Sequence, residues 1–287
     1  MHSFTKNLTE TASMHTTTFW SRVTRTIVLA VLVSVSGVSV WAAPIDLSAW
    51  TAESYGSVGG FPDGVWNVGG GGDFVVQQNN GQPTIFYSDF NAIDSDVTGT
   101  VQVLSGGDDD FFGFVLGFEP GDSTSASADY LLLDWKGGSQ FFNFTGNAAT
   151  NATPGSTAPA GLALSQVSGT PSADEIWGHV DFVENPGGGV DELGRGDTLG
   201  GTGWAVGTEY DFRFIFTSTN IEVYVDDVLQ LDIDGTFSDG RLGFYNFSQH
   251  QVRYSAFEIE PAPAPAPATV LLFAAGIAGL GSSRRRS

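Results

Sequence analysis

The 287-residue sequence contains no cysteine, which excludes disulfide bonds and cysteine-ligated zinc or redox sites. Its four histidines form no metal-ligand spacing, so a histidine-rich zinc site is not expected either. The stability of the fold must therefore come from noncovalent packing, and any bound metal would need oxygen ligands.

Basic residues are also scarce. The chain has 11 Lys and Arg against 32 Asp and Glu, which gives a formal net charge of −21. A surface of this sign repels nucleic acid and anionic membranes, so we expect no nucleic-acid partner. Such an excess can indicate disorder, but 22 Phe, 7 Trp and 7 Tyr supply a large core. The composition instead favours a folded protein that attracts divalent cations or basic partners.

The first apolar run lies near the start of the chain. Residues 1–42 combine basic residues with an apolar run at 26–40 and end in small residues at Ala42, the pattern of a cleaved signal peptide. Met14 is an alternative start that would shorten the basic part. A membrane anchor is the competing interpretation, but a span needs about 20 apolar residues.

The second apolar run lies at the other end, in segment 261–287. A Pro-Ala repeat, which is a stiff and extended spacer, precedes the uncharged stretch 268–283. Three arginines, at 284–286, follow and would stay in the cytoplasm. Because the stretch is short for a bilayer, we expect a transient transmembrane helix in the inner membrane rather than a permanent anchor.

Between these ends, segment 43–260 shows short alternating patterns separated by turn residues, and none with helical periodicity over three turns. We therefore predict an all-β protein, a sandwich of two sheets, with Asp226 and Asp227 in a hairpin turn. Strands are expected at 84–90, 98–104, 111–118, 162–166, 175–184, 210–216, 221–225, 228–233 and 252–259. The stretches 59–72, 146–161 and 185–203 are expected to be turns and loops, and the first is not a phosphate loop because no helix follows it.

Three consecutive carboxylates, Asp108, Asp109 and Asp110, run directly into the apolar stretch 111–118. Both faces of that stretch are apolar or small, so it is expected to be a central strand. Adjacent like charges repel, and the sequence offers few Lys or Arg to pair with them. A hard cation such as Ca²⁺ is the simplest counter-charge, and the three aspartates are our predicted calcium site. A solvated cluster is the alternative.

Other candidate sites are weaker. A second calcium candidate comprises Asp232, Asp234 and Asp239. Arg195-Gly196-Asp197 could mimic an integrin ligand, although such a tripeptide arises easily by chance. Tryptophans that could stack on sugars are more often core residues, which we expect for Trp135, Trp177 and Trp204.

Segment 179–184 shares its spacing with the Glu-x-Asp-x-x-Glu strand of laminarinase-type glycosidases. His179 stands where the nucleophilic glutamate would be, Asp181 follows at period two, and Glu184 joins that face only across a bulge. A retaining glycosidase needs two carboxyl groups about 5–5.5 Å apart, one of them the nucleophile, and imidazole cannot replace it. We therefore expect no enzymatic activity here.

Several motifs together resemble the C-terminal lectin-like domain of thrombospondins. They are Asp108-Asp-Asp-Phe-Phe-Gly-Phe-Val-Leu-Gly-Phe, Tyr130-Leu-Leu-Leu-Asp-Trp-Lys, Gly161-Leu-Ala-Leu and Gly240-Arg-Leu-Gly-Phe, in family order. The resemblance implies a concanavalin A-like jelly-roll β-sandwich that is secreted, binds calcium through the Asp108 to Asp110 segment and takes part in adhesion or matrix contacts.

The tail, 261–287, resembles the PEP-CTERM sorting signal of Gram-negative bacteria, with Pro-Ala-Pro repeats in place of Pro-Glu-Pro. This implies contact with export and sorting machinery and a final place at the cell surface or outside the cell. We therefore expect a calcium-binding, non-catalytic protein that contacts extracellular polysaccharide or a matrix protein. A glycoside hydrolase or carbohydrate-binding lectin of the same fold, and a passive component of the exopolysaccharide layer, are the alternatives.

Overall fold

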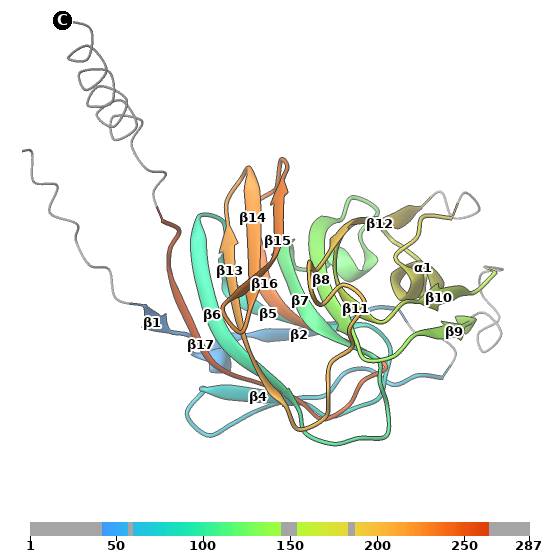
Figure 1. Ribbon diagram of the computed structural model, residues 1–287, viewed down its shortest axis with the longest axis horizontal. Coiled ribbons are helices and arrows are strands. Elements are labelled where there is room, and N and C mark those ends of the chain that lie inside the picture. The colour runs from blue at the N-terminus through green and yellow to red at the C-terminus, as the bar shows by residue number, and fades with distance from the viewer. Residues whose placement is uncertain (1–41, 57–59, 145–153, 183–186, 264–287) are drawn as a thin grey trace, which may run out of the picture. The chain divides into compact units, whose positions relative to one another are not determined.

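Two antiparallel sheets make up most of the computed structural model, which describes residues 42–56, 60–144, 154–182 and 187–263 (Figure 1). The eight-stranded sheet, here sheet A, has the order β15-β14-β13-β6-β17-β4-β3, and β1 pairs with β17. Its strands are β1 (Ala43–Pro44), β3 (Trp66–Val68), β4 (Phe74–Gln77), β6 (Ser95–Val103), β13 (Glu209–Phe216), β14 (Asn220–Val225), β15 (Val228–Asp234) and β17 (Val252–Pro261).

The seven-stranded sheet, here sheet B, has the order β12-β11-β8-β7-β16-β5-β2. Its strands are β2 (Thr51–Ser54), β5 (Thr84–Asn91), β7 (Phe111–Phe118), β8 (Asp129–Lys136), β11 (Gly161–Gly169), β12 (Gly188–Arg195) and β16 (Arg241–Phe247). The short pair β9 (Gln140–Phe142) and β10 (Ser156–Ala158), the helix α1 (Ala173–Gly178), and the 3-10 turns η1 (Leu47–Ala49) and η2 (Asp122–Thr124) complete the described elements.

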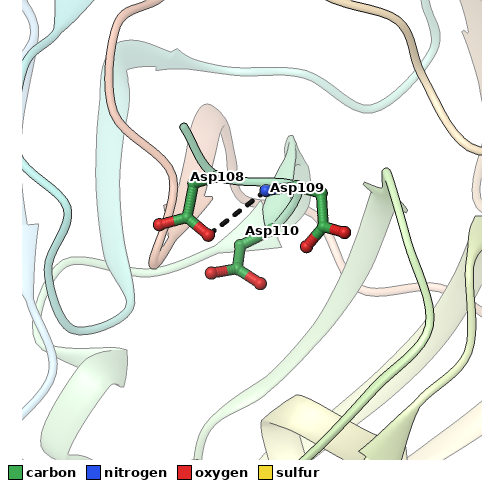
Figure 2. Close-up of side chains that lie close together, drawn as sticks. All are labelled: Asp108, Asp109 and Asp110. Atoms are coloured by element: carbon green, nitrogen blue, oxygen red, sulfur yellow. Dashed lines mark hydrogen bonds between the residues drawn. The ribbon is translucent and has the colours of Figure 1, made fainter. Parts of the chain in front are cut away.

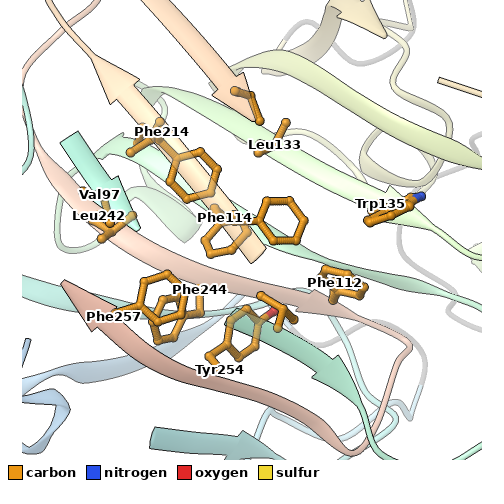
Figure 3. Close-up of a cluster of buried hydrophobic side chains, with 14 of the residues drawn as sticks. Val97, Phe112, Phe114, Leu133, Trp135, Phe214, Leu242, Phe244, Tyr254 and Phe257 are labelled. Carbon is orange, nitrogen blue, oxygen red and sulfur yellow. The ribbon is translucent and has the colours of Figure 1, made fainter. Parts of the chain in front are cut away.

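The main core lies between the two sheets and is built largely from aromatic rings (Figure 3). Phe114 of sheet B meets Phe214 of sheet A with ring centroids 4.5 Å apart, and Phe244 stacks on Tyr254 at 4.4 Å. These rings come from strands whose alternate residues face inward, as period-two patterning requires. The predicted all-β, two-sheet architecture is therefore confirmed.

The central strand predicted at 111–118 is also confirmed, because β7 covers those residues and every one of them is buried. Its inner face enters the main core, while its outer face enters a second apolar cluster. That second cluster includes Phe111 and Tyr245 of sheet B and Trp177 of α1. Figure 1 shows α1, β9 and β10 gathered beside β8, β11 and β12. Sheet B is therefore covered on both faces there.

The hairpin predicted at Asp226 and Asp227 is confirmed between β14 and β15. Both residues have positive φ, 51° and 63°, the conformation that a type I′ turn needs. Tyr210, Phe212, Phe214 and Phe216 of β13 contribute to or pack against the main core, as their alternation predicted.

Each of the three stretches predicted to be turns or loops contains a strand, because tertiary pairing recruits part of the stretch into a sheet. β3 lies inside the stretch expected to be turns, where it pairs with β4. β10 and β12 lie in stretches expected to be loops, and they pair with β9 and β11. Intrinsic propensity is a weak guide at sheet edges, since a partner strand can satisfy the backbone of a glycine-rich segment.

The strand predicted at 175–184 is wrong, because its first residues belong to α1. Ser172 accepts a hydrogen bond from the Glu175 amide at 3.2 Å, and the Glu175 carboxylate accepts one from the Ser172 amide at 2.6 Å. This capping box begins the helix, and His179, with φ of 50°, ends it.

The predicted signal helix and the predicted short transmembrane helix fall on 1–42 and 261–287, almost wholly outside the described residues. Among the residues that are described, no helix is long and apolar enough to cross a membrane.

Candidate functional site

The three predicted metal ligands lie together immediately before β7. One carboxylate oxygen from each of Asp108, Asp109 and Asp110 falls within 4.8 Å of the others. Figure 2 shows all three carboxylates on the same side of the backbone. Asp110 is buried because it abuts the buried strand, Asp108 is half-buried and Asp109 is exposed. An open hollow of about 490 Å³, lined by Gly107, Asp108, Asp109, Ser139 and Gln140, gives the cluster access to solvent.

Lys136, one of the few basic residues in the sequence, supplies a positive charge beside these aspartates. Its Nζ lies 2.6 Å from an Asp110 oxygen and 3.0 Å from an Asp109 oxygen, and it donates to the Asp109 carbonyl at 2.9 Å. The pairing of β7 with β8 places Phe111 opposite Lys136, which brings the ammonium beside the cluster. Lys136 therefore pairs with two of the three aspartates, although the sequence offers few Lys or Arg.

Lys136 is itself fully buried, which is unusual for a lysine. Its Nζ lies 5.0 Å from the ring centroid of Trp177 and 5.8 Å from that of Phe111. Aromatic faces attract a desolvated cation, so the rings add to the two ion pairs. The ammonium is thus a fixed part of the fold.

The electrostatics of Asp110 reflect this burial. Desolvation, with a smaller effect from neighbouring Asp108, raises the pKa of Asp110 to about 7, although the Lys136 ammonium acts in the opposite direction. Asp108 also accepts a hydrogen bond from the Asn80 side chain. When all three carboxylates are ionised, they and the one ammonium carry a net charge of −2, which one divalent cation would neutralise.

The donor set fits a hard cation. Lys136 binds Oδ1 of Asp109 and Oδ1 of Asp110 and makes no ion pair with Oδ2 of either carboxylate. Carboxylate oxygens are the ligands that Ca²⁺ prefers, with water completing its shell. Asp108, Asp109 and Asp110 could therefore hold such an ion on the solvent side of the cluster.

The weaker calcium candidate is not assembled in the described structure. Asp232 and Asp234 accept hydrogen bonds from the Asn220 side-chain amide at 2.8 and 3.2 Å. Asp239 instead receives the Asn91 side chain and the Ile93 amide. The three carboxylates already have separate partners and do not form a group around one point.

A second polar cluster, which sequence reasoning missed, lies on the outer face of sheet B beneath α1. His179 lies between Asp134, at 3.1 Å from Nε2, and Glu192, at 3.3 Å from Nδ1. Burial alone would lower the pKa of His179, but Asp134 and Glu192 outweigh it and raise the pKa to about 9. Burial also raises the pKa of Asp134, opposed by His179. The residues are far apart in sequence, so no local pattern could have revealed the cluster.

This arrangement also corrects the glycosidase comparison. His179 and Asp181 do not share one face of a strand, because His179 is the C-cap of α1 and has a left-handed backbone conformation. Glu184 lies outside the described residues. The Glu-x-Asp-x-x-Glu geometry that the alternative needs is therefore absent at the described positions, His179 and Asp181.

The tryptophans have structural roles, as predicted. Trp135, Trp177 and Trp204 are all buried, at 1%, 1% and 6% exposure. Each indole N–H donates to a backbone carbonyl, and that of Trp204 binds the Asp110 carbonyl at 2.9 Å. Trp204 thereby helps to fix the backbone of the carboxylate cluster.

The Arg-Gly-Asp tripeptide has a structural explanation at its first residue. The Arg195 guanidinium binds Glu192 at 3.1 Å and donates to the carbonyls of Ala160 and Gly200. An arginine held by its own loop in this way is not presented as a free ligand.

Comparison with known families gives a match to the thrombospondin C-terminal region over residues 61–262. The chain belongs to the thrombospondin C-terminal region family. Both sheets of the sandwich fall largely inside the matched range, as does the Asp108 to Asp110 cluster. Chicken thrombospondin-2 is 30% identical to this chain over 210 residues. That match covers 68% of this chain and 16% of thrombospondin-2, so the chain spans about a sixth of its length.

Solved structures that resemble this member of the family do so distantly. The carbohydrate-binding module CBM66 from Bacillus subtilis has a TM-score of 0.46 and 12% identity, covering 74% of this chain and 95% of its own. A family 16 endo-glucanase from Bacteroides ovatus has a TM-score of 0.41 and 9% identity, covering 75% and 98%. Sheep galectin-11 has a TM-score of 0.32 and 8% identity, covering 61% and 95%.

Proposed function

We propose that this protein is a non-catalytic, calcium-binding β-sandwich that contacts polysaccharide or matrix protein outside the cell. The observation that carries the calcium proposal is the gathering of three carboxylates, only two of them paired to Lys136, beside an open hollow. Membership of the thrombospondin C-terminal family supports a role in adhesion or matrix contact.

A bound Ca²⁺ would act as a structural cross-link. Asp108, Asp109 and Asp110 would hold it. The ion would neutralise the negative charge of the three carboxylates that the Lys136 ammonium does not balance. Because Trp204 binds the Asp110 backbone and β7 follows at once, the ion would stabilise the end of the central strand.

The extracellular location and the partners are inferred from the ends of the sequence. Segment 1–42 has the pattern of a signal peptide, and 261–287 has the pattern of a sorting tail with a short apolar stretch. They support export by a Gram-negative bacterium, passage through the sorting machinery with a transient inner-membrane span, and a final place at the cell surface or in the exopolysaccharide.

The calcium proposal predicts that Ca²⁺ raises the melting temperature above that measured with EDTA, because an ion that binds only the folded state stabilises it. In Asp108→Asn/Asp109→Asn the increase should disappear, while the chain still folds because the buried pair of Lys136 and Asp110 remains. Melting is measured by differential scanning calorimetry.

The matched control is Asp232→Asn/Asp234→Asn, which removes the same number of charges from β15 and should keep the full calcium response. Equal melting temperatures for the wild-type chain with EDTA and with saturating Ca²⁺ would refute the metal site.

A further inference from the structure

A second hollow lies on the outward face of sheet A, whereas the carboxylate cluster precedes β7 of sheet B. It has a volume of about 220 Å³ and is open to solvent. Its polar lining comes from three neighbouring strands and one turn: Thr98, Thr100, Asp211, Arg213, Tyr224 and Asp227. The residues that alternate with them, such as Phe212, face the main core.

The floor of this hollow is shaped by an irregularity of β17. The pairing of β17 with β6 shifts register between Ser255 and Glu258, and Ala256 within that bulge has φ of 56°. A left-handed conformation is unfavourable for an alanine, so the surrounding structure must impose it. Gly99 lies below and leaves room that the Phe257 ring fills from the core side. Bulges of this kind commonly reshape a sheet face beside a binding site.

Arg213 is held rigidly in the wall of the hollow. Its Nε lies 2.9 and 3.2 Å from the two oxygens of Asp96, and Nη2 makes a further bond to the same carboxylate. The Asp96 side chain is 1% exposed, whereas that of Arg213 is 40% exposed. The guanidinium carbon also lies 5.4 Å from the centroid of the Tyr224 ring. Asp96 therefore neutralises Arg213, and Nη1 of Arg213 takes no part in this ion pair.

Two carboxylates face the same space without a described partner. Asp211 and Asp227 are exposed, and no described side chain or amide donates to their carboxylate oxygens. With Arg213 already paired to Asp96, these two charges make the hollow net negative. An anionic ligand would be repelled, while a neutral ligand rich in hydroxyl groups could donate to the carboxylates and accept from Arg213.

The corresponding face of sheet B is much less available. Its outward residues, including Val115, Leu132 and Val167, belong to the second apolar cluster and are buried. A ligand that approaches a sheet face of the described sandwich therefore meets polar, exposed side chains on sheet A and a covered surface on much of sheet B.

We propose that the hollow formed by β6, β13, β14 and the β17 bulge binds a unit of a neutral polysaccharide. Asp211 and Asp227 accept hydrogen bonds from the sugar hydroxyls, Arg213 donates to them, and the threonines complete the polar lining. This inference rests on the proposed polysaccharide contact and assigns that contact to specific residues.

The test measures binding of neutral glucans, namely laminarin, dextran and mixed-linkage glucan, by affinity gel electrophoresis, with polygalacturonate as an anionic probe. The wild-type chain should bind at least one neutral glucan and should not bind polygalacturonate. Asp211→Ala/Asp227→Ala should weaken that binding by about tenfold or more, because charged acceptors are lost. Both side chains are exposed, so the variant should fold, which circular dichroism verifies.

A control variant on the other sheet separates the possible outcomes. Asp191→Ala removes an exposed carboxylate from β12 of sheet B, and this variant should bind the glucan as the wild type does. If the wild-type chain binds but Asp211→Ala/Asp227→Ala binds equally well, this inference is wrong and the proposed function stands. If the wild-type chain binds none of the neutral glucans, the polysaccharide contact itself is refuted together with its location.

Discussion

Lys136 shows how one basic residue can neutralise carboxylates that lie far from it in the sequence. It follows the cluster by more than twenty residues, yet the β7–β8 pairing returns it to Asp109 and Asp110. A buried ammonium is costly unless it is paired, and two carboxylates are costly without it. The lysine and the buried aspartate are therefore required together.

Replacing Lys136 by Met should lower the free energy of unfolding by about 3–5 kcal/mol without metal, because the Asp110 carboxylate is left buried and unpaired. Adding Asp110→Asn to this variant should recover part of the loss, since the uncompensated charge is removed. Urea unfolding with EDTA present measures both.

The response to Ca²⁺ tests whether Lys136 stabilises the fold through its charge rather than through packing alone. If an ion can occupy the same cluster, Ca²⁺ should stabilise Lys136→Met more than it stabilises the wild-type chain, because the ion then meets an additional uncompensated charge. A variant that is as stable as the wild-type chain with EDTA would show that the ion pairs contribute little.

At the scale of elements, α1 is fastened to sheet B through its C-terminal cap. His179 ends the helix and reaches Asp134 of β8 and Glu192 of β12. Trp177, two residues before His179, packs against Phe111 with ring centroids 5.4 Å apart. A charged contact and an aromatic contact thus hold a six-residue helix that is too short to be stable alone.

The attachment of α1 should depend on pH. The pKa of His179 is raised from 6.5 to about 9, so the stability it contributes is complete below about pH 6.5 and is lost as the pH rises toward 9. Over that interval the free energy of unfolding of the wild-type chain should fall, and that of His179→Gln should change less. Chemical unfolding at a series of pH values measures both.

The matched control for this prediction is His250→Gln, since His250 lies outside the cluster and should leave the pH dependence as it is in the wild-type chain. Nuclear magnetic resonance titration of His179 gives an independent reading. A pKa at or below the ordinary value would contradict the assigned ion pair with Asp134.

At the scale of the whole molecule, the net charge of −21 is the dominant electrostatic feature. Like charges over the surface repel and disfavour the compact state, and salt screens them over a Debye length of about 10 Å at 0.1 M. The aromatic core between the sheets and the second cluster on sheet B must outweigh this repulsion.

Raising NaCl from about 0.02 M to about 0.5 M should therefore increase the melting temperature, because screening relieves the self-repulsion. Choline chloride at the same ionic strength should act equally, since screening does not depend on the identity of the cation. CaCl₂ should exceed both if the ion also binds specifically. A melting temperature that falls with NaCl would show that attractive ion pairs outweigh the net repulsion.

The fold class, the central strand and the proximity of the three aspartates were all predictable from the sequence. These features depend on local physics: alternation places Phe112 and Phe114 on one face, and adjacent residues such as Asp108 and Asp109 must be close in any fold. The hairpin at Asp226 followed from turn chemistry for the same reason. The capping box of Ser172 and Glu175 was also local, and attention to it would have predicted α1.

Contacts between side chains on different strands, in contrast, depend on the tertiary fold. The pairs of Lys136 with Asp110, His179 with Asp134 and Arg213 with Asp96 join residues 26, 45 and 117 positions apart. Strand register sets these contacts, and register depends on how whole sheets bury their apolar faces. The same dependence explains why strands β3 and β12, which lie within glycine-rich stretches, and the hollow on sheet A could not be predicted from the sequence, since neighbouring strands rather than local propensity create them.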